Sequence, residues 1–157
     1  MFFTRVFAFA VFAVSLVSAV AIKKRADVSE VLGVVDILKS STDAILPQID
    51  SLVNSNAATQ ANISPHLASL VEALNTASTS LHGLQGNVDT SSSDANEVAN
   101  AVAPVFTKIN NSINNLETKD PNLVSLVATS GISTALDTVL TGWEIVVAGV
   151  LQLLSGL

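Results

Sequence analysis

Apolar residues recur at steps of three and four along most of the chain after residue 27, which is typical of helices that bury one face. The first series is Val28, Val31, Leu32, Val35, Leu38, Ile45, Ile49, Leu52 and Val53, with Thr42 in the missing place. The second is Leu67, Leu70, Val71, Leu74, Ala77, Leu81 and Leu84. The third is Ala95, Val98, Ala99, Val102, Val105, Phe106, Ile109, Ile113 and Leu116.

The fourth series, Leu136, Leu140, Trp143, Val147, Val150 and Leu154, alternates steps of four and three. That spacing is expected of a helix packed nearly parallel to its neighbours. No stretch combines strict alternation with β-branched residues, so we expect no sheet. The sequence therefore predicts an all-α fold, a bundle of four helices or of five if a short helix at 123–127 is counted.

Prolines and polar stretches set the expected boundaries of these helices. Pro47 should kink or end the first helix near residues 45–46 and divide it into two segments, and Pro104 should bend the third, because proline lacks an amide donor. After a polar loop at 54–62, Ser64-Pro65 predicts an N-cap and first turn for the second helix. A flexible connection is expected at 87–94.

The beginning of the chain has the pattern of a secretory signal. An apolar run ends in Ala19-Val20-Ala21, and the tribasic run that follows ends at Arg25. We therefore expect a signal peptide at 1–21 cleaved after Ala21, a propeptide at 22–25 removed by a dibasic-processing protease, a domain at 26–157, and a secreted, extracellular protein. A membrane anchor through 2–22 is the alternative, but the run is short and contains two serines.

Charge and composition after residue 25 exclude several classes of partner. This part has three Lys, no Arg and thirteen acidic residues, a formal net charge of −10, so we expect no nucleic-acid binding and weaker binding of anionic than of neutral amphiphiles. The chain has no cysteine, so burial alone must hold the fold. Phe106 and Trp143 are the only aromatic residues there, and the core must be aliphatic.

Motifs for catalysis or metal binding are not found in the sequence. His66 and His82 are sixteen residues apart, and there is no Gly-x-Ser-x-Gly motif. We therefore expect no enzyme activity, no catalytic residue, no metal and no cofactor. Asn110-Asn111-Ser112 and Asn62-Ile63-Ser64 are N-glycosylation sequons, with Asn110 the better candidate because Pro65 follows the other.

Gly142, Gly149 and Gly156 recur every seven residues and so share one side of the last predicted helix. Glycine costs roughly 1 kcal/mol against alanine inside a helix, so the series needs a reason. Two explanations are possible: a neighbouring helix approaches this side closely, or the glycines form a slot for an alkyl chain. The ligand-binding candidates are Phe106, Gly142, Trp143, Val147, Gly149 and Val150.

The Val-x-x-Val-Leu-x-x-Val rhythm that opens 27–54 and the Asn-rich end of 95–118 resemble the fungal hydrophobic surface-binding protein A and cell-wall galactomannoprotein family. The resemblance implies a secreted, non-catalytic helical domain that adsorbs to hydrophobic surfaces or binds fatty acids between its helices, with cell-wall glycans or a secreted hydrolase as further partners and cell-wall association. It supplies no site motif. The alternative is a structural or antigenic wall mannoprotein that carries glycans at Asn110 and 90–93.

Overall fold

The computed structural model describes residues 28–85 and 92–154, with side chains described for 28–85 and 96–144. Its helices are α1 (Val28–Asn54), α2 (Gln60–Leu84), α3 (Ser92–Lys119), the 3-10 turn η1 (Pro121–Leu123), α4 (Val124–Thr129) and α5 (Ile132–Leu154). In these ranges there is no strand, which confirms the predicted all-α bundle. The predicted signal peptide and propeptide lie outside the described residues.

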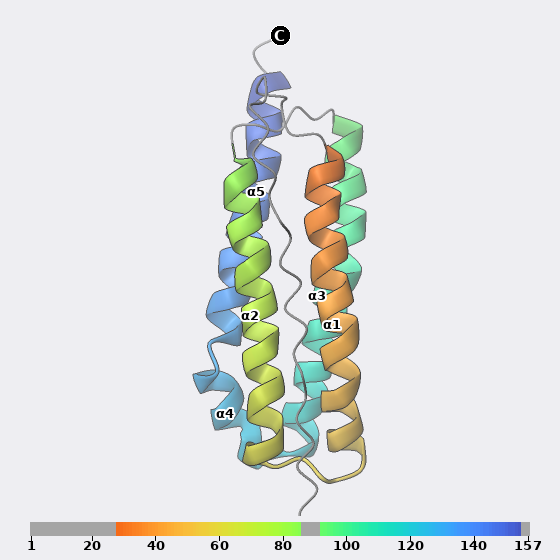
Figure 1. The fold of residues 1–157 in the computed structure, drawn as a ribbon, viewed down its shortest axis with the longest axis vertical. Coiled ribbons are helices and arrows are strands. Elements are labelled where there is room, and N and C mark those ends of the chain that lie inside the picture. The colour runs from red at the N-terminus through yellow and green to blue at the C-terminus, as the bar shows by residue number, and fades with distance from the viewer. Residues whose placement is uncertain (1–27, 86–91, 155–157) are drawn as a thin grey trace, which may run out of the picture.

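The four long helices form a bundle that is packed closely on three edges and open on the fourth. α1 lies along both α2 and α3, and α2 also lies along α5, whereas α3 and α5 touch far less. Figure 1 shows α1 and α2 in front, with α3 and α5 behind them. At the lower end, η1 and α4 pack against α3, and α4 also contacts α2 and α5. The open edge between α3 and α5 is therefore closed at this end.

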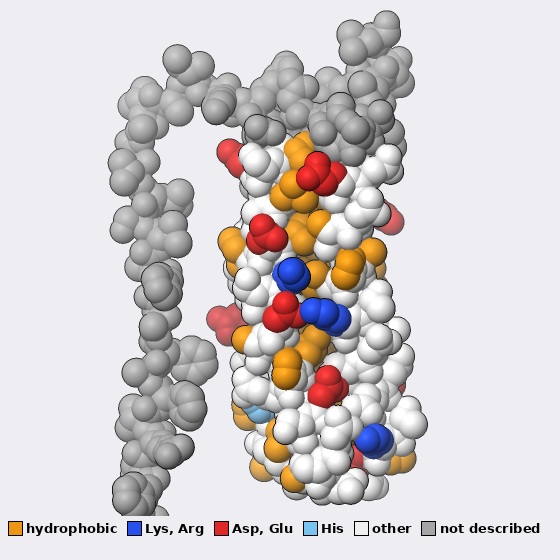
Figure 2. All heavy atoms as spheres, turned by 90° about the vertical axis from the view of Figure 1, so that its right-hand side faces the viewer, with side chains coloured by type: hydrophobic (Ala, Val, Ile, Leu, Met, Phe, Trp, Pro, Cys, Tyr) orange, Lys and Arg blue, Asp and Glu red, His pale blue; other side chains and the backbone are white. Residues whose placement is uncertain are grey.

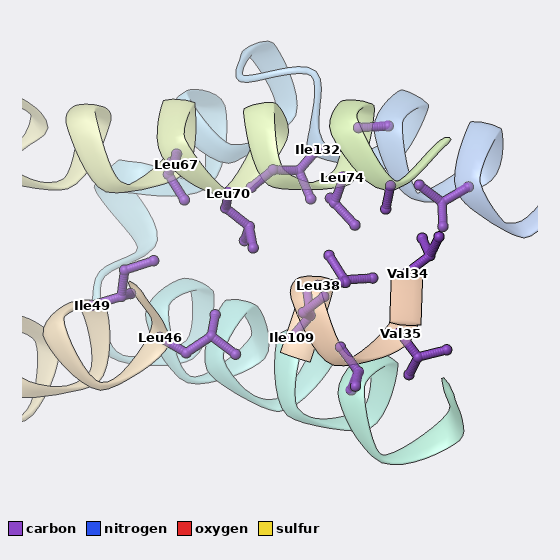
Figure 3. Close-up of a cluster of buried hydrophobic side chains, with 14 of the residues drawn as sticks. Val34, Val35, Leu38, Leu46, Ile49, Leu67, Leu70, Leu74, Ile109 and Ile132 are labelled. Carbon is purple, nitrogen blue, oxygen red and sulfur yellow. The ribbon is translucent and has the colours of Figure 1, made fainter. Parts of the chain in front are cut away.

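The predicted apolar series form the core. Leu38 of α1, Leu70 of α2 and Ile109 of α3 are each at most 1% exposed, and Figure 3 shows them pointing into the centre between the helices. Burying each such side chain stabilises the fold by about 1.5 to 3 kcal/mol. Thr42 occupies the missing apolar place, fully buried, and its hydroxyl donates to the Lys39 carbonyl at 2.9 Å. Its polar atom is therefore satisfied.

The helices α1 and α3 continue through their prolines. Pro47 lies inside α1 and Pro104 inside α3, so neither helix ends at its proline, and the kinks predicted at these two residues stay predictions. Proline has no amide hydrogen, so Pro47 cannot donate to the carbonyl of Asp43, and Pro104 cannot donate to that of Asn100. All four residues are exposed. Because those carbonyls lie on the solvent side, water can satisfy them, and the helix need not end.

The helix α2 begins four residues before the predicted N-cap at Ser64, and that prediction is wrong. Thr59 is the N-cap: its hydroxyl accepts from the Asn62 amide at 3.4 Å, and its own amide donates to Asn62 Oδ1 at 2.7 Å. This is a capping box with asparagine in the place of the usual glutamate. The loop is consequently shorter than 54–62, and Pro65 lies within the helix.

The other boundaries follow the sequence more closely. Gly131 separates α4 from α5 at a φ of 83°, as its place after the short predicted helix indicates, because glycine adopts this backbone conformation readily. The helix α3 begins at Ser92, so the predicted connection at 87–94 is shorter at its C-terminal end. Residues 86–91 lie outside the described residues.

Candidate functional site

An apolar groove of about 330 Å³ lies along the open edge of the bundle, between α3 and α5. The lining residues from α3 are Val98, Ala99, Val102, Ala103 and Phe106, and those from α5 are Leu140, Trp143 and Glu144. The lining surface is almost entirely carbon. Its volume lies at the lower end of the range for small-molecule sites, which are concave and mostly apolar.

The composition of α3 explains why the groove is hollow. Ala99 and Ala103 are one helical turn apart, and both are exposed and short, so they leave space where longer side chains would fill it. On the facing helix, Leu140 is 43% exposed, although most large apolar side chains among those described are buried. The groove therefore leaves apolar surface in contact with water, and covering that surface would be favourable.

Trp143 belongs to both the core and the groove. It is 6% exposed and lines the groove, and its indole Nε1 is buried with no hydrogen-bond partner among the described residues. An unpaired buried donor costs about 1 to 3 kcal/mol, and such groups in native structures call for a specific explanation.

The structure brings some of the predicted site residues together and separates others. Phe106 and Trp143 line the groove, whereas Gly142 is buried on another side of α5, against α2. A Cβ added to Gly142 would lie 3.4 Å from Leu81 Cδ1 and 3.6 Å from Leu81 Cβ. At this position the glycine therefore serves a close contact between helices.

The remaining candidates lie beyond the described side chains. Val147, Gly149 and Val150 are part of α5, but their side-chain surroundings are outside the described residues, as is Gly156 altogether. The ligand-binding role predicted for them stays a prediction. Sequence reasoning did not select Ala99, Ala103 and Leu140 as site residues. The signal that could have found the two alanines is their spacing of four residues, with Ala99 inside the apolar series of α3 and Ala103 just outside it.

We predict opposite effects for two substitutions at Gly142. Gly142→Ala should raise the free energy of unfolding by up to about 1 kcal/mol, since alanine is the better helix former and its Cβ fits at ordinary contact distance from Leu81. Gly142→Leu should lower it by about 1 to 3 kcal/mol through overpacking. Denaturant unfolding of both variants beside the wild type measures this. A neutral Gly142→Leu would show that the contact with Leu81 is loose.

Polar and charged groups gather on a different face, along the seam between α1 and α3. Lys108 Nζ donates to Asp43 Oδ1 at 2.7 Å, and Lys119 Nζ donates to Asn54 Oδ1 at 2.6 Å. The hydrogen bond from Lys108 holds the pKa of the Asp43 carboxyl below its ordinary value. Figure 2 shows Lys and acidic side chains together in the middle of this face.

One member of this seam is buried. Ser112 is 2% exposed, and its hydroxyl donates to Asp50 Oδ1 at 2.9 Å, as does Asn115 Nδ2 at 3.3 Å. These bonds pair α1 with α3 in one register. Lys108 and Lys119 thus serve the contact between α1 and α3, and none of the three described lysines lines the apolar groove.

The sequons occupy two different settings. Asn110 is exposed on α3, whereas the Asn62 side chain is engaged at the start of α2, where its Nδ2 donates to the Ala57 carbonyl at 2.7 Å. Glycosylation at either position stays a prediction. Within the described residues no three His, Asp or Glu side chains come together as metal ligands.

Among the described helices, none is by itself long and apolar enough to cross a bilayer. The segments Pro121–Thr129 and Ile132–Glu144 meet that criterion only as a pair, bent by 51° at the break between them.

Comparison with known proteins gives one partial relationship. The chain is 45% identical over 58 residues to fruiting body differentiation protein 16 of the fungus Flammulina velutipes, an alignment that covers 37% of this chain and 45% of that protein. The chain therefore matches less than half the length of this relative. No family model matches the chain, and no solved structure matches it. A fungal relative is thus established, while membership of the surface-binding and galactomannoprotein family stays a prediction.

Proposed function

We propose that this is a secreted, non-catalytic protein that binds the hydrocarbon chain of a single-chain lipid, of the fatty-acid type in its apolar part, in the groove between α3 and α5. The observation that carries the proposal is the groove itself: about 330 Å³ with an almost wholly apolar lining that includes both Phe106 and Trp143. The same surface would serve adsorption to a hydrophobic solid.

The size of the groove bounds the affinity. If a methylene takes about the volume of a water molecule, about 30 Å³, the groove holds about ten of them. At about 0.8 kcal/mol for each buried methylene, the gross gain is about 8 kcal/mol. Association and ordering of the chain cost several kcal/mol of this. We therefore expect affinities weaker than micromolar, in the range that suits reversible capture of a chain.

Two further features support an extracellular role. The apolar run and the basic residues up to Arg25 have the pattern expected of a secretory signal, and the sequon at Asn110 is exposed. The fungal relative fits a fungal setting, in which the cell wall would be one location. On this proposal the protein acts outside the cell on lipids or waxy surfaces, with wall glycans or a secreted hydrolase as neighbours.

Trp143 provides the test, because it is the only tryptophan of the chain and lines the groove. We expect 12-bromododecan-1-ol to quench its fluorescence saturably, since bromine quenches only at close range, and we expect unbrominated dodecan-1-ol to reverse the quenching. Titration of the purified secreted protein below the solubility limit of both alcohols measures this. Unchanged fluorescence, or quenching that dodecan-1-ol does not reverse, would rule out a chain bound in this groove.

The alternative, a wall mannoprotein that serves as a scaffold for glycans, is favoured by the exposure of Asn110. The same secreted material distinguishes the two functions. Glycan mass at Asn110 without any quenching by the brominated alcohol would favour the scaffold.

A further inference from the structure

The charge at the apolar groove bears on the head group of the ligand. Among the described residues that line the groove, Glu144 is the only charged one, and it is exposed. Because polar atoms contribute almost nothing to the lining surface, the aliphatic stem of Glu144 lines the groove and its carboxylate lies outside the apolar lining.

The cations of the described residues lie elsewhere. Lys39 and Lys108 line a separate pocket between α1 and α3, where Lys108 is paired with Asp43. Lys119, on α3, donates a hydrogen bond to Asn54, on α1. No described lysine is therefore placed to receive a carboxylate head group at the apolar groove, and Glu144 would repel one.

From this arrangement we infer that the groove selects single-chain amphiphiles with a cationic head group, of the long-chain amine type, over fatty acids. The Glu144 carboxylate would pair with the ammonium at the rim while the chain lies between α3 and α5. The rings of Phe106 and Trp143 line the same groove, and an ammonium is the head group that aromatic rings attract. This inference rests on the proposed function, because it assigns the head group of the chain that the groove holds.

The test uses three probes of equal chain length: dodecylammonium, dodecan-1-ol and dodecanoate. Each competes with 12-bromododecan-1-ol, and recovery of Trp143 fluorescence gives its affinity at low ionic strength, below its critical micelle concentration. We expect dodecylammonium to bind about five- to tenfold more tightly than dodecanoate, with the alcohol between them, because an exposed ion pair changes affinity by a few-fold. Salt at 0.5 M should shrink the difference.

A matched pair of variants separates Glu144 from the net charge of the protein. Glu144→Gln should bring dodecylammonium and dodecan-1-ol within about twofold of each other. Glu72→Gln removes the same charge from an exposed position on α2 that does not line the groove, so it should keep the preference. Circular dichroism confirms that both variants remain folded.

The results of these experiments separate a failure of the head-group preference from a failure of chain binding. Dodecanoate binding as tightly as dodecylammonium would overturn the inference and leave chain binding intact. Equal loss of preference in Glu144→Gln and Glu72→Gln would also overturn it, since the preference would then arise from the overall charge. If no probe restores the fluorescence, or the brominated alcohol does not quench, the proposed function fails and the inference fails with it.

Discussion

Ala103→Leu should lower the affinity for dodecan-1-ol by about ten- to fiftyfold. The alanine is exposed and lines the groove, and leucine adds three carbon atoms at that point. These would take the place of about three methylenes of the ligand, at about 0.8 kcal/mol each, or about 2.4 kcal/mol in total. The fold should tolerate the change, because leucine is nearly as good a helix former as alanine. Competition against 12-bromododecan-1-ol measures the affinity.

The control is Ala44→Leu, which makes the same chemical change at an exposed position of α1 outside the groove. It should leave both the affinity and the melting temperature unchanged. If Ala103→Leu binds dodecan-1-ol as well as the wild type does, the chain lies elsewhere. If both variants lose affinity to the same extent, the loss reports added surface hydrophobicity rather than a filled groove.

Leu70→Ala should lower the free energy of unfolding by about 2 to 5 kcal/mol. Leu70 is completely buried where α2 faces the other long helices (Figure 3), and its truncation removes transfer energy and leaves a cavity. Because a domain of this size has roughly 5 to 15 kcal/mol of net stability, the loss is a large fraction of the total. We expect the melting temperature to fall by roughly 10 to 20 °C, measured by circular dichroism at 222 nm.

Leu140→Ala is the comparison that separates stability from binding. It removes the same atoms from a side chain that is 43% exposed and lines the groove. We expect it to cost less than about 1 kcal/mol of stability and to weaken dodecan-1-ol binding, whereas folded Leu70→Ala should bind normally. A large stability loss in Leu140→Ala would mean that this residue is part of the core, and the groove would then be shallower than described.

The site could be predicted only in part. Phe106 and Trp143 were candidates because they belong to the apolar series of their helices, and the structure places both in the lining of the groove, where their binding role stays a prediction. Ala99 belongs to the predicted apolar series of α3 and Ala103 does not, and nothing in the sequence indicates that both face an open edge. Gly142 was assigned to the same side as the other glycines of the last helix, and the structure places it against Leu81.

Some helix boundaries could be predicted from the local sequence, and others could not. Gly131 marked a break correctly because the backbone conformation there suits glycine. Ser64 was the predicted cap for α2, and the reciprocal hydrogen bonds between Thr59 and Asn62 place the cap at Thr59 instead. Pro47 and Pro104 did not end their helices, because the carbonyls left without donors lie on the exposed side.

The sequence by itself determined the helical class, the approximate helices and most of the core, because burial of a helix face depends on the spacing of apolar residues within that helix. Which edges of the bundle close was decided by tertiary packing. The groove joins residues 98–106 to residues 140–144, and it exists because α1 and α2 take up the close contacts of their neighbours and leave α3 and α5 apart. Periodicity shows that a face is apolar, but what covers that face depends on the other helices.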